Sequence, residues 1–305
     1  MVSQADLDRF YEALVTSARA DGAVCAITSD LACVRYHVAH ATKDCDVLCA
    51  TESAELFLNR LAQTVFEGAP CSYRGHLTPP LDARWMRGGW TSHFEWKWDV
   101  GFAHLDVFGV APRASSPWTV DVHGLLAGMH TVAEMKRTDR PKDWPFATAL
   151  GAKMLEVGDV RGWWHLFDAD ALRRLIIRVP CPPEIIAHRP LLELLVTNDP
   201  RLDVAVFAES MFWQQLDRLR LRIHEAFMRK YRSAVTKAAG VDDPDLWIQH
   251  RVRLQFAQDF LPENPLRDYG IDRLIAEARE ETLRFVAPGS LDWLPDASRH
   301  FVGLA

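Results

Sequence analysis

The sequence lacks a long apolar run: no uninterrupted hydrophobic stretch approaches the roughly 18 residues that a membrane-spanning helix needs. It also lacks a basic and then apolar leader, because its first residues include Asp6 and Asp8. The six cysteines show no Cys-x-x-Cys spacing, and most lie in apolar runs, as reduced core thiols do. We therefore expect no secretion and no membrane partner, and the simplest location is the cytoplasm.

An excess of positive charge is also missing. The net charge of -6 argues against a protein that binds nucleic acid over its whole surface. One segment departs from this balance, since residues 218–237 carry seven basic residues against the single acid Glu225, on an expected helix. Two interpretations stay open for it: a solvated helix face, or a surface that follows the phosphates of RNA or contacts another partner.

The elements expected from the first 122 residues describe an α/β unit. Apolar spacing predicts a helix over residues 3–19 with Ser3 as N-cap, then a strand at 24–28, a helix at 31–38, a strand at 44–49 and a helix at 53–66. Residues 93–110 alternate like a β-hairpin that turns near Gly101. Strands and helices in this order predict a mixed sheet with flanking helices.

The second half of the chain has mostly helical spacing. Helices are expected at 124–137 and 145–157, and one long helix at 202–239, with proline-rich breaks between later segments. With 305 residues and 49% hydrophobic content, the chain is long enough for two domains or one large one. We predict an α/β domain at 1–122 and a helical region at 123–305, whose part 123–150 completes the site.

The candidate site begins with two carboxylates in an apolar strand. Side chains two apart on a strand share a face, so we expect Asp44 and Asp46 to point to the same side of the strand. The apolar residues that flank them indicate that this strand is buried. Asp106 lies in a second apolar strand. Buried carboxylates without a partner become neutral unless a cation compensates them, and hard divalent cations prefer carboxylate oxygens. This pattern favours a Mg²⁺ site, with Mn²⁺ as an alternative metal.

Spacing alone is weak evidence, because Asp-x-Asp recurs at 168–170 and 243–245, where it is typical of helix caps and turns. Histidine pairs do not support a zinc site, since none has the His-Glu-x-x-His spacing of a zinc enzyme. His104 lies two residues before Asp106 on the same strand face, where it is placed to orient that carboxylate or to contact substrate.

A basic turn follows the α/β unit: residues 134–146 read E-M-K-R-T-D-R-P-K-D-W-P-F. Together with the strand carboxylates, this segment resembles the polymerase-β-like minimal nucleotidyltransferases, a group that includes abortive-infection toxin enzymes. The resemblance covers residues 20–150. It matches Ser29 to the family's small-residue turn, Asp44 and Asp46 to its paired carboxylates, and Asp106 to its third carboxylate.

The resemblance implies an enzyme that transfers a nucleoside monophosphate from a nucleoside triphosphate to a hydroxyl of RNA, protein or a small molecule. Two Mg²⁺ ions on the three aspartates would support in-line attack. Ser29, Lys136, Arg140 and Lys142 would bind the nucleotide, with Lys136 facing the triphosphate. For Arg140 and Lys142 a surface salt-bridge turn is an equal alternative.

One position departs from the family, whose turn usually contains glycine where this chain has Ser29 and Asp30. Glycine permits a close approach of the backbone to phosphate, whereas an aspartate near a triphosphate adds repulsion unless it caps the next helix. We therefore expect Asp30 to act as the N-cap of the following helix. The departure supports an alternative function: an inactive nucleotidyltransferase-like module that binds nucleotide or protein. A different metal-dependent phosphoryl-transfer or hydrolytic enzyme is the third possibility.

Overall fold

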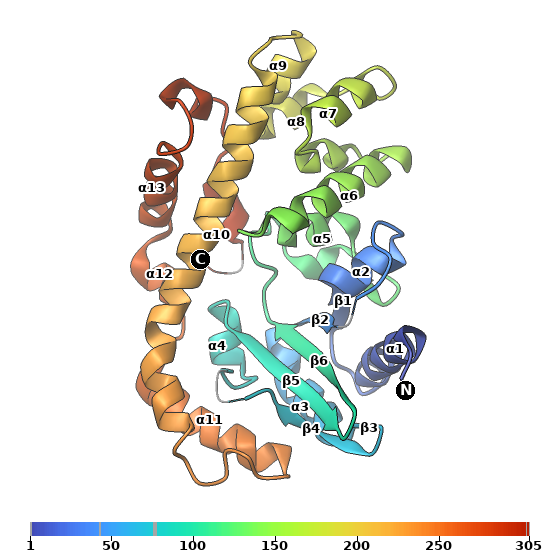
Figure 1. The fold of residues 1–305 in the computed structure, drawn as a ribbon, viewed down its shortest axis with the longest axis vertical. Coiled ribbons are helices and arrows are strands. Elements are labelled where there is room, and N and C mark those ends of the chain that lie inside the picture. Colours follow the sequence, from blue (N-terminus) through green and yellow to red (C-terminus); the bar gives the residue numbers. More distant parts are fainter. Residues whose placement is uncertain (1, 43, 76–77, 303, 305) are drawn as a thin grey trace.

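The computed structural model describes residues 2–42, 44–75, 78–302 and 304. The chain has a mixed α/β architecture, in which one mixed sheet of eight strands is combined with many helices (Figure 1). This part of the sequence-based prediction is confirmed. Within the residues that the structure describes, no helix has both the length and the apolar character needed to cross a bilayer.

The sheet has the strand order β3-β4-β5-β6-β2-β1-β8-β7. Two pairs are parallel, β2 with β6 and β1 with β8, and the other pairs are antiparallel. The strands are β1 (Cys25–Thr28), β2 (Asp44–Cys49), β3 (Val65–Phe66), β4 (Ala69–Tyr73), β5 (Thr91–Trp98), β6 (Gly101–Phe108), β7 (Val122–His123) and β8 (Leu126–Ala127).

Helices cover both faces of the sheet. On one face, α1 (Gln4–Ala20) and α3 (Ala54–Ala62) pack against the strands and form a buried apolar core. On the other face, α2 (Ser29–Arg35), α5 (Met129–Met135) and α6 (Trp144–Glu156) contribute to a second buried cluster. The side chains of Ser3 and Asp6 form a capping box at the start of α1, which confirms Ser3 as its N-cap.

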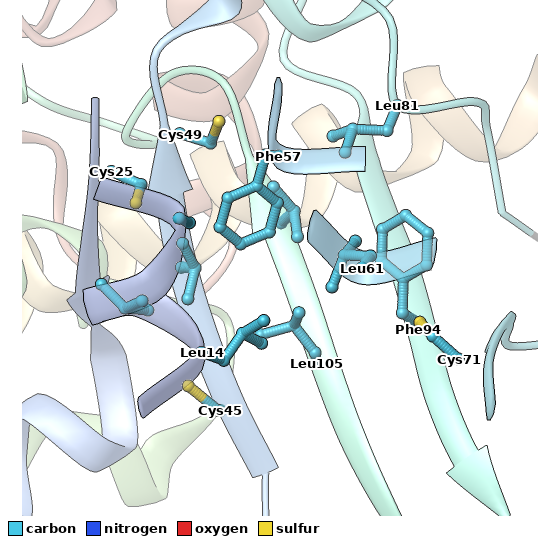
Figure 2. Close-up of a cluster of buried hydrophobic side chains, with 14 of the residues drawn as sticks. Leu14, Cys25, Cys45, Cys49, Phe57, Leu61, Cys71, Leu81, Phe94 and Leu105 are labelled. Atoms are coloured by element: carbon cyan, nitrogen blue, oxygen red, sulfur yellow. The ribbon is translucent and has the colours of Figure 1, made fainter. Parts of the chain in front are cut away.

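Strand alternation decides which side chains enter the first core. Cys45 and Cys49 of β2 and Leu105 of β6 point into it, where they meet Leu14 of α1 and Phe57 of α3 (Figure 2). Five of the six cysteines are buried and all six are unpaired, as expected for core thiols. The alternate residues of β2 and β6 must therefore face the opposite side of the sheet.

Several element boundaries differ from the sequence-based expectation. The helix expected at 53–66 is shorter, with a short 3₁₀ turn η1 (Thr51–Ser53) before α3 and strand β3 after it. The helix expected at 124–137 begins only at Met129. Gly124, at φ 57°, instead closes a tight turn between β7 and β8. These two strands lie at the expected boundary near residue 122, and the domain division itself stays a prediction.

Most of the remaining chain is helical. The long helix α10 (Leu202–Val235) runs along one side of the molecule and contacts α13 (Ile271–Thr282) and α11 (Leu246–Phe260) (Figure 1). It begins where the sequence predicts and ends four residues earlier. The other helical elements are α4 (Ala83–Arg87), η2 (Trp118–Val120), η3 (Pro141–Asp143), η4 (Val160–His165), α7 (Ala169–Ile176), α8 (Pro183–His188), α9 (Leu192–Val196), α12 (Pro265–Tyr269), η5 (Pro288–Leu291) and η6 (Ala297–Phe301).

Candidate active site

The three aspartates lie on one face of the sheet, on two adjacent parallel strands. In the β2–β6 pairing, Asp46 is the direct partner of Asp106, and Asp44 is the partner of His104. Their strand neighbours fill the core on the opposite face. Asp44 is exposed, while Asp46 and Asp106 are half-buried. The strand pairing thus brings together two carboxylates that are sixty residues apart in the sequence.

A cavity of about 350 Å³ opens on this face of the sheet. Its floor includes the three aspartates and Ser29, and its wall includes Arg140 from the basic turn. Helix α10 closes another side with residues that the sequence did not single out as part of the site. The additional lining residues are Asp30, Phe108, Pro112, Arg113, Met135, Thr138, Asp139, Asp217, Arg220 and Leu221.

The burial of Asp46 and the charge of Asp106 raise the pKa of Asp46 to about 7, from an ordinary value of 3.8. A hydrogen bond from the Ser29 side chain and the charge of Lys136 oppose this rise only in part. The electrostatic cost anticipated for this strand is therefore present. Near neutral pH, any cation that approaches Asp46 lowers that cost.

Ser29 follows β1, next to Thr28, which is the register partner of Asp46. The backbone of Ser29 has φ 51°, in the left-handed region that favours glycine. The expected role of Asp30 is wrong: the helix begins at Ser29, its N-cap is Thr28, and Asp30 lies in the first turn. The carboxylate of Asp30 instead accepts a hydrogen bond from the ammonium group of Lys136.

Lys136 follows the last residue of α5 and is only 1% exposed. Its Nζ forms an ion pair with Asp30 and lies 3.8 Å from Asp143 Oδ1. Burial opposes the charged form, but Asp30 and the other neighbouring acidic groups raise the pKa of Lys136 above its ordinary value. The lysine is therefore a charged group at the edge of the site, held by carboxylates of this chain.

The other two expected nucleotide ligands, Arg140 and Lys142, lie in different positions. Arg140 lines the cavity and forms an ion pair with Asp143, with NH2 2.7 Å from Oδ2. Lys142 is exposed and is not among the cavity's lining residues. The hydroxyl of Thr138 donates to the same Asp143 oxygen at 2.6 Å. The basic turn is thus organised around Asp143, which is buried.

Two cationic or proton-bearing groups contact Asp106 from neighbouring segments. Arg74 NH2 donates to Asp106 Oδ1 at 2.9 Å, and His93 Nδ1, on β5, lies 2.7 Å from the same oxygen. His93 is the register partner of Asp106 in the β5–β6 pairing. His104 Nδ1 lies 3.2 Å from Asp44 Oδ1, so the histidine contacts Asp44 and not Asp106 in this pair of strands.

The far wall of the cavity contains a buried ion-pair network. Asp217 of α10 is 2% exposed, pairs with the guanidinium of Arg113 and accepts from Arg220 Nε at 2.9 Å. Asp217 also accepts from the backbone N–H of Asp139 at 3.0 Å. Burial opposes its ionisation, but Arg113 and Arg220 hold the pKa of Asp217 below its usual value. This network fixes α10 against the basic turn and aims Arg220 at the cavity.

The donor chemistry at Asp46 and Asp106 fits a hard divalent cation, because both are carboxylates and the cost of the negative charge on Asp46 is relieved only in part. However, within the described part of the chain no group of three or more histidine, cysteine, aspartate or glutamate side chains is arranged to hold a metal ion. Arg74 and His93 already contact one of the two carboxylate oxygens of Asp106, Oδ1.

Sequence reasoning missed Arg74, His93, Arg113, Asp217 and Arg220. The alternation of β5 offered a signal for His93, because it lies on the polar face of a hairpin whose partner strand carries Asp106. No such signal marks Arg113 or Asp217, which are 104 residues apart.

In the comparisons with known proteins, no family model, curated protein or solved structure matches this chain.

Proposed function

We propose that the chain is a nucleotidyltransferase with a polymerase-β-like fold, dependent on Mg²⁺ or Mn²⁺, that moves a nucleoside monophosphate from a nucleoside triphosphate to an acceptor hydroxyl. The observation that carries the proposal is the pairing of Asp46 with Asp106 on adjacent parallel strands, where burial and the negative charge of Asp106 raise the pKa of Asp46 to about 7. A site that brings two carboxylates together at this cost is typical of cation-dependent phosphoryl chemistry.

The surroundings of the aspartates also suit a polyanionic substrate. The same cavity is lined by the guanidinium-bearing residues Arg113, Arg140 and Arg220, and Lys136 lies behind Asp30. Guanidinium groups match phosphate oxygens in a fork geometry, and an ammonium group neutralises them as a point charge. The cavity thus combines acidic groups on the sheet with basic groups from the turn and from α10.

In the proposed reaction, the acceptor oxygen attacks the α-phosphorus while the bond from that phosphorus to the bridging oxygen breaks, pyrophosphate leaves, and the hydroxyl proton passes to the Asp106 carboxylate or to water. Asp44, Asp46 and Asp106 would hold a divalent cation, which would supply charge neutralisation. The chain's own residues bind and orient: Ser29 turns its hydroxyl from Asp46 to donate to a phosphate oxygen, and Asp106, positioned by Arg74 and His93, orients the acceptor hydroxyl. Lys136 and Arg140 hold the outer phosphates.

The direct experiment incubates the protein with Mg²⁺ or Mn²⁺, a panel of α-labelled nucleotides and mixed RNA, protein and small-molecule acceptors. We expect transfer of label by the wild-type protein and its loss in Asp46→Asn. Asp170→Asn is the matched control, because Asp170 belongs to another Asp-x-Asp sequence and its side chain is largely exposed. Transfer that survives Asp46→Asn contradicts the proposal.

The second candidate is an inactive nucleotidyltransferase-like module that binds nucleotide or a protein. Two ion pairs within the chain favour it: Lys136 with Asp30 and Arg74 with Asp106 already neutralise charges that the reaction uses. Nucleotide binding without transfer, unchanged in Asp46→Asn, supports this module and rejects the enzyme.

A further inference from the structure

A second cavity, of about 310 Å³, lies away from the aspartates. It is partly open to solvent and is lined by α5, the 3₁₀ helix η4, the end of α8, α10, the loop at residues 115–116 and the segment before Phe301. Its volume is about ten times the ~30 Å³ that one water takes in the liquid, so it has room for an organic molecule. The lining residues are Ser115, Ser116, His130, Arg137, Arg161, Trp164, His188, Arg189, Glu209, Pro295, Asp296, Arg299 and His300, and none of them lines the candidate active site.

Arg137 is the central charge of this cavity and is 2% exposed. Its guanidinium nitrogens are hydrogen-bonded to a carbonyl and two histidine rings: the Trp164 carbonyl at 3.3 Å, His165 Nδ1 at 3.1 Å and His300 Nδ1 at 3.3 Å. Its Nε has no hydrogen-bond partner, and among the described residues no carboxylate forms an ion pair with it. A buried cation normally has an anionic partner, so this position is unusual.

The other guanidinium groups on the cavity wall each have a carboxylate of their own. Arg189 is paired with Glu209 at 2.7 Å, and Arg299 with Asp296 at 3.2 Å. Arg161 is paired with Asp159 at 2.7 Å, outside the cavity lining. Among the described residues, Arg137 is therefore the guanidinium on this wall that has no carboxylate ion pair of its own.

The charges of two carboxylates, Glu134 and Glu209, reach Arg137, but Glu209 is paired with Arg189 and Glu134 is engaged elsewhere. Its oxygens accept from the Ser115 hydroxyl at 2.5 Å and the Ser115 backbone N–H at 3.1 Å, and they lie near His130 and His300. Burial opposes the ionisation of Glu134, but these histidines and Arg137 lower its pKa to about 2. Burial, in turn, lowers the pKa of Arg137 more than the attraction of Glu134 raises it.

Neutral polar groups complete the wall. His130 Nδ1 lies 2.8 Å from His165 Nε2, and burial lowers the pKa of both rings, so neither adds a charge near neutral pH. His130 Nε2 lies 3.3 Å from the hydroxyl of Ser115 at the cavity surface. The Trp164 ring packs 5.2 Å from His188 and 5.7 Å from His130, which gives the cavity an aromatic side.

We propose that this cavity binds a small organic anion, whose oxyanion group pairs with Arg137 and whose apolar part lies against Trp164. The unpaired buried guanidinium, the three other arginines and the aromatic wall all favour such a ligand over a cation or a neutral polar molecule. Carboxylates and phosphate monoesters share the required oxyanion chemistry. The site is independent of the proposed transferase reaction, since the two cavities share no lining residue.

The test measures binding of phenyl phosphate, benzoate and benzylamine to the full chain by calorimetry and thermal shift. We expect at least one of the two anions to bind and to raise the melting temperature, and benzylamine to do neither. The preferred anion tells whether the site suits phosphate esters or carboxylates. Binding of neither anion, or equal binding of benzylamine, overturns the proposal.

Two variants locate the bound anion. Arg137→Gln removes the charge but keeps a polar side chain and is expected to weaken binding at least tenfold, whereas Arg220→Gln, in the other cavity, leaves the affinity for the anion unchanged. Loss of binding in Arg220→Gln with retention in Arg137→Gln assigns the anion to the other cavity and rejects the proposal. If Arg137→Gln does not fold, Arg299→Glu decides, because Arg299 is largely exposed; unchanged affinity there also rejects the proposal.

Discussion

Asp46 and Asp106 are register partners across the parallel strands β2 and β6, and their side chains share the face that lines the candidate active site. The two carboxylates differ in their surroundings. Asp106 is contacted by Arg74 and His93, whereas Asp46 has a hydrogen bond from Ser29 and the more distant charge of Lys136. The pair is therefore asymmetric, and Asp46 is the carboxylate that lacks a direct cationic partner among the described residues.

Replacing Asp46 by asparagine is expected to stabilise the fold at neutral and higher pH. The folded-state pKa of about 7 exceeds the ordinary value of 3.8, so ionisation costs nothing below pH 4, costs progressively more up to pH 7 and costs a constant amount above it. The full cost is about 4 kcal/mol at most. Urea unfolding of wild type and Asp46→Asn from pH 4 to pH 9 measures it, and a pH-independent difference contradicts the assignment.

A divalent cation at the site has the opposite effect on the wild-type protein. Mg²⁺ is expected to raise its melting temperature more at pH 8 than at pH 5, because protons compete for Asp46 at the lower pH. The increase is expected to be lost in Asp46→Asn and kept in Asp170→Asn. An equal shift in all three proteins places the cation elsewhere.

Arg74→Gln is expected to strengthen Mg²⁺ binding, because it removes the guanidinium that neutralises Asp106. The pair is partly exposed and worth about 1 kcal/mol, so the dissociation constant is expected to fall about fivefold. Calorimetric titration with Mg²⁺ provides the measurement. Arg84→Gln, which breaks the pair with Asp82 outside the cavity, is the matched control. Weaker binding by Arg74→Gln shows that the arginine supports the metal site.

Asp30→Asn is expected to increase affinity for a non-hydrolysable nucleoside triphosphate, because it frees Lys136 and removes a negative charge from the cavity lining. The free energy of unfolding is expected to fall by only about 1–2 kcal/mol, because Asp143 remains near the ammonium group of Lys136. Equilibrium binding of wild type, Asp30→Asn and the charge-preserving Asp30→Glu gives the comparison. A lower affinity in Asp30→Asn means that the Asp30–Lys136 pair itself holds the nucleotide site in shape.

Asp217→Asn is expected to destabilise the protein by about 3–5 kcal/mol at pH 7, because it leaves the buried guanidinium of Arg113 without its carboxylate. The lowered pKa of Asp217 means that this contribution is present above pH 4 and is lost as the pH falls further. Asp203→Asn, on the same helix but in an exposed pair with Arg173, is expected to cost no more than about 1 kcal/mol. Chemical denaturation distinguishes the two variants.

The basic segment of α10 is expected to bind RNA only through its exposed residues, which include Arg222, Arg229 and Lys230. Their triple alanine variant is expected to lower the slope of log affinity against log salt by about 2, near 0.7 for each lost phosphate contact. Arg232 is not part of this variant, because it is paired with Glu225. Equal RNA binding by variant and wild type leaves the segment as a solvated helix face.

Local patterns in the sequence were sufficient to predict the main secondary elements near the site. Alternation of apolar residues at 44–49 and 103–107 places Asp44 and Asp46 on one face and Asp106 on the outer side of its own strand, because a strand has a two-residue period. Prediction from local patterns failed for a short segment whose sequence is compatible with both a helix and a hairpin. Residues 122–127 form a small hairpin instead of the beginning of a helix, because Gly124 adopts a positive φ.

The sequence by itself therefore determined the α/β character of the first half, the helical character of the second and the strand face on which each aspartate lies. Only the tertiary structure decided which groups meet there. Arg74 reaches Asp106, Lys136 reaches Asp30 and Asp217 reaches Arg113 across separations of 32, 106 and 104 residues. Periodicity determines the direction of a side chain within its own element, whereas its partner depends on strand order and helix packing over the whole chain.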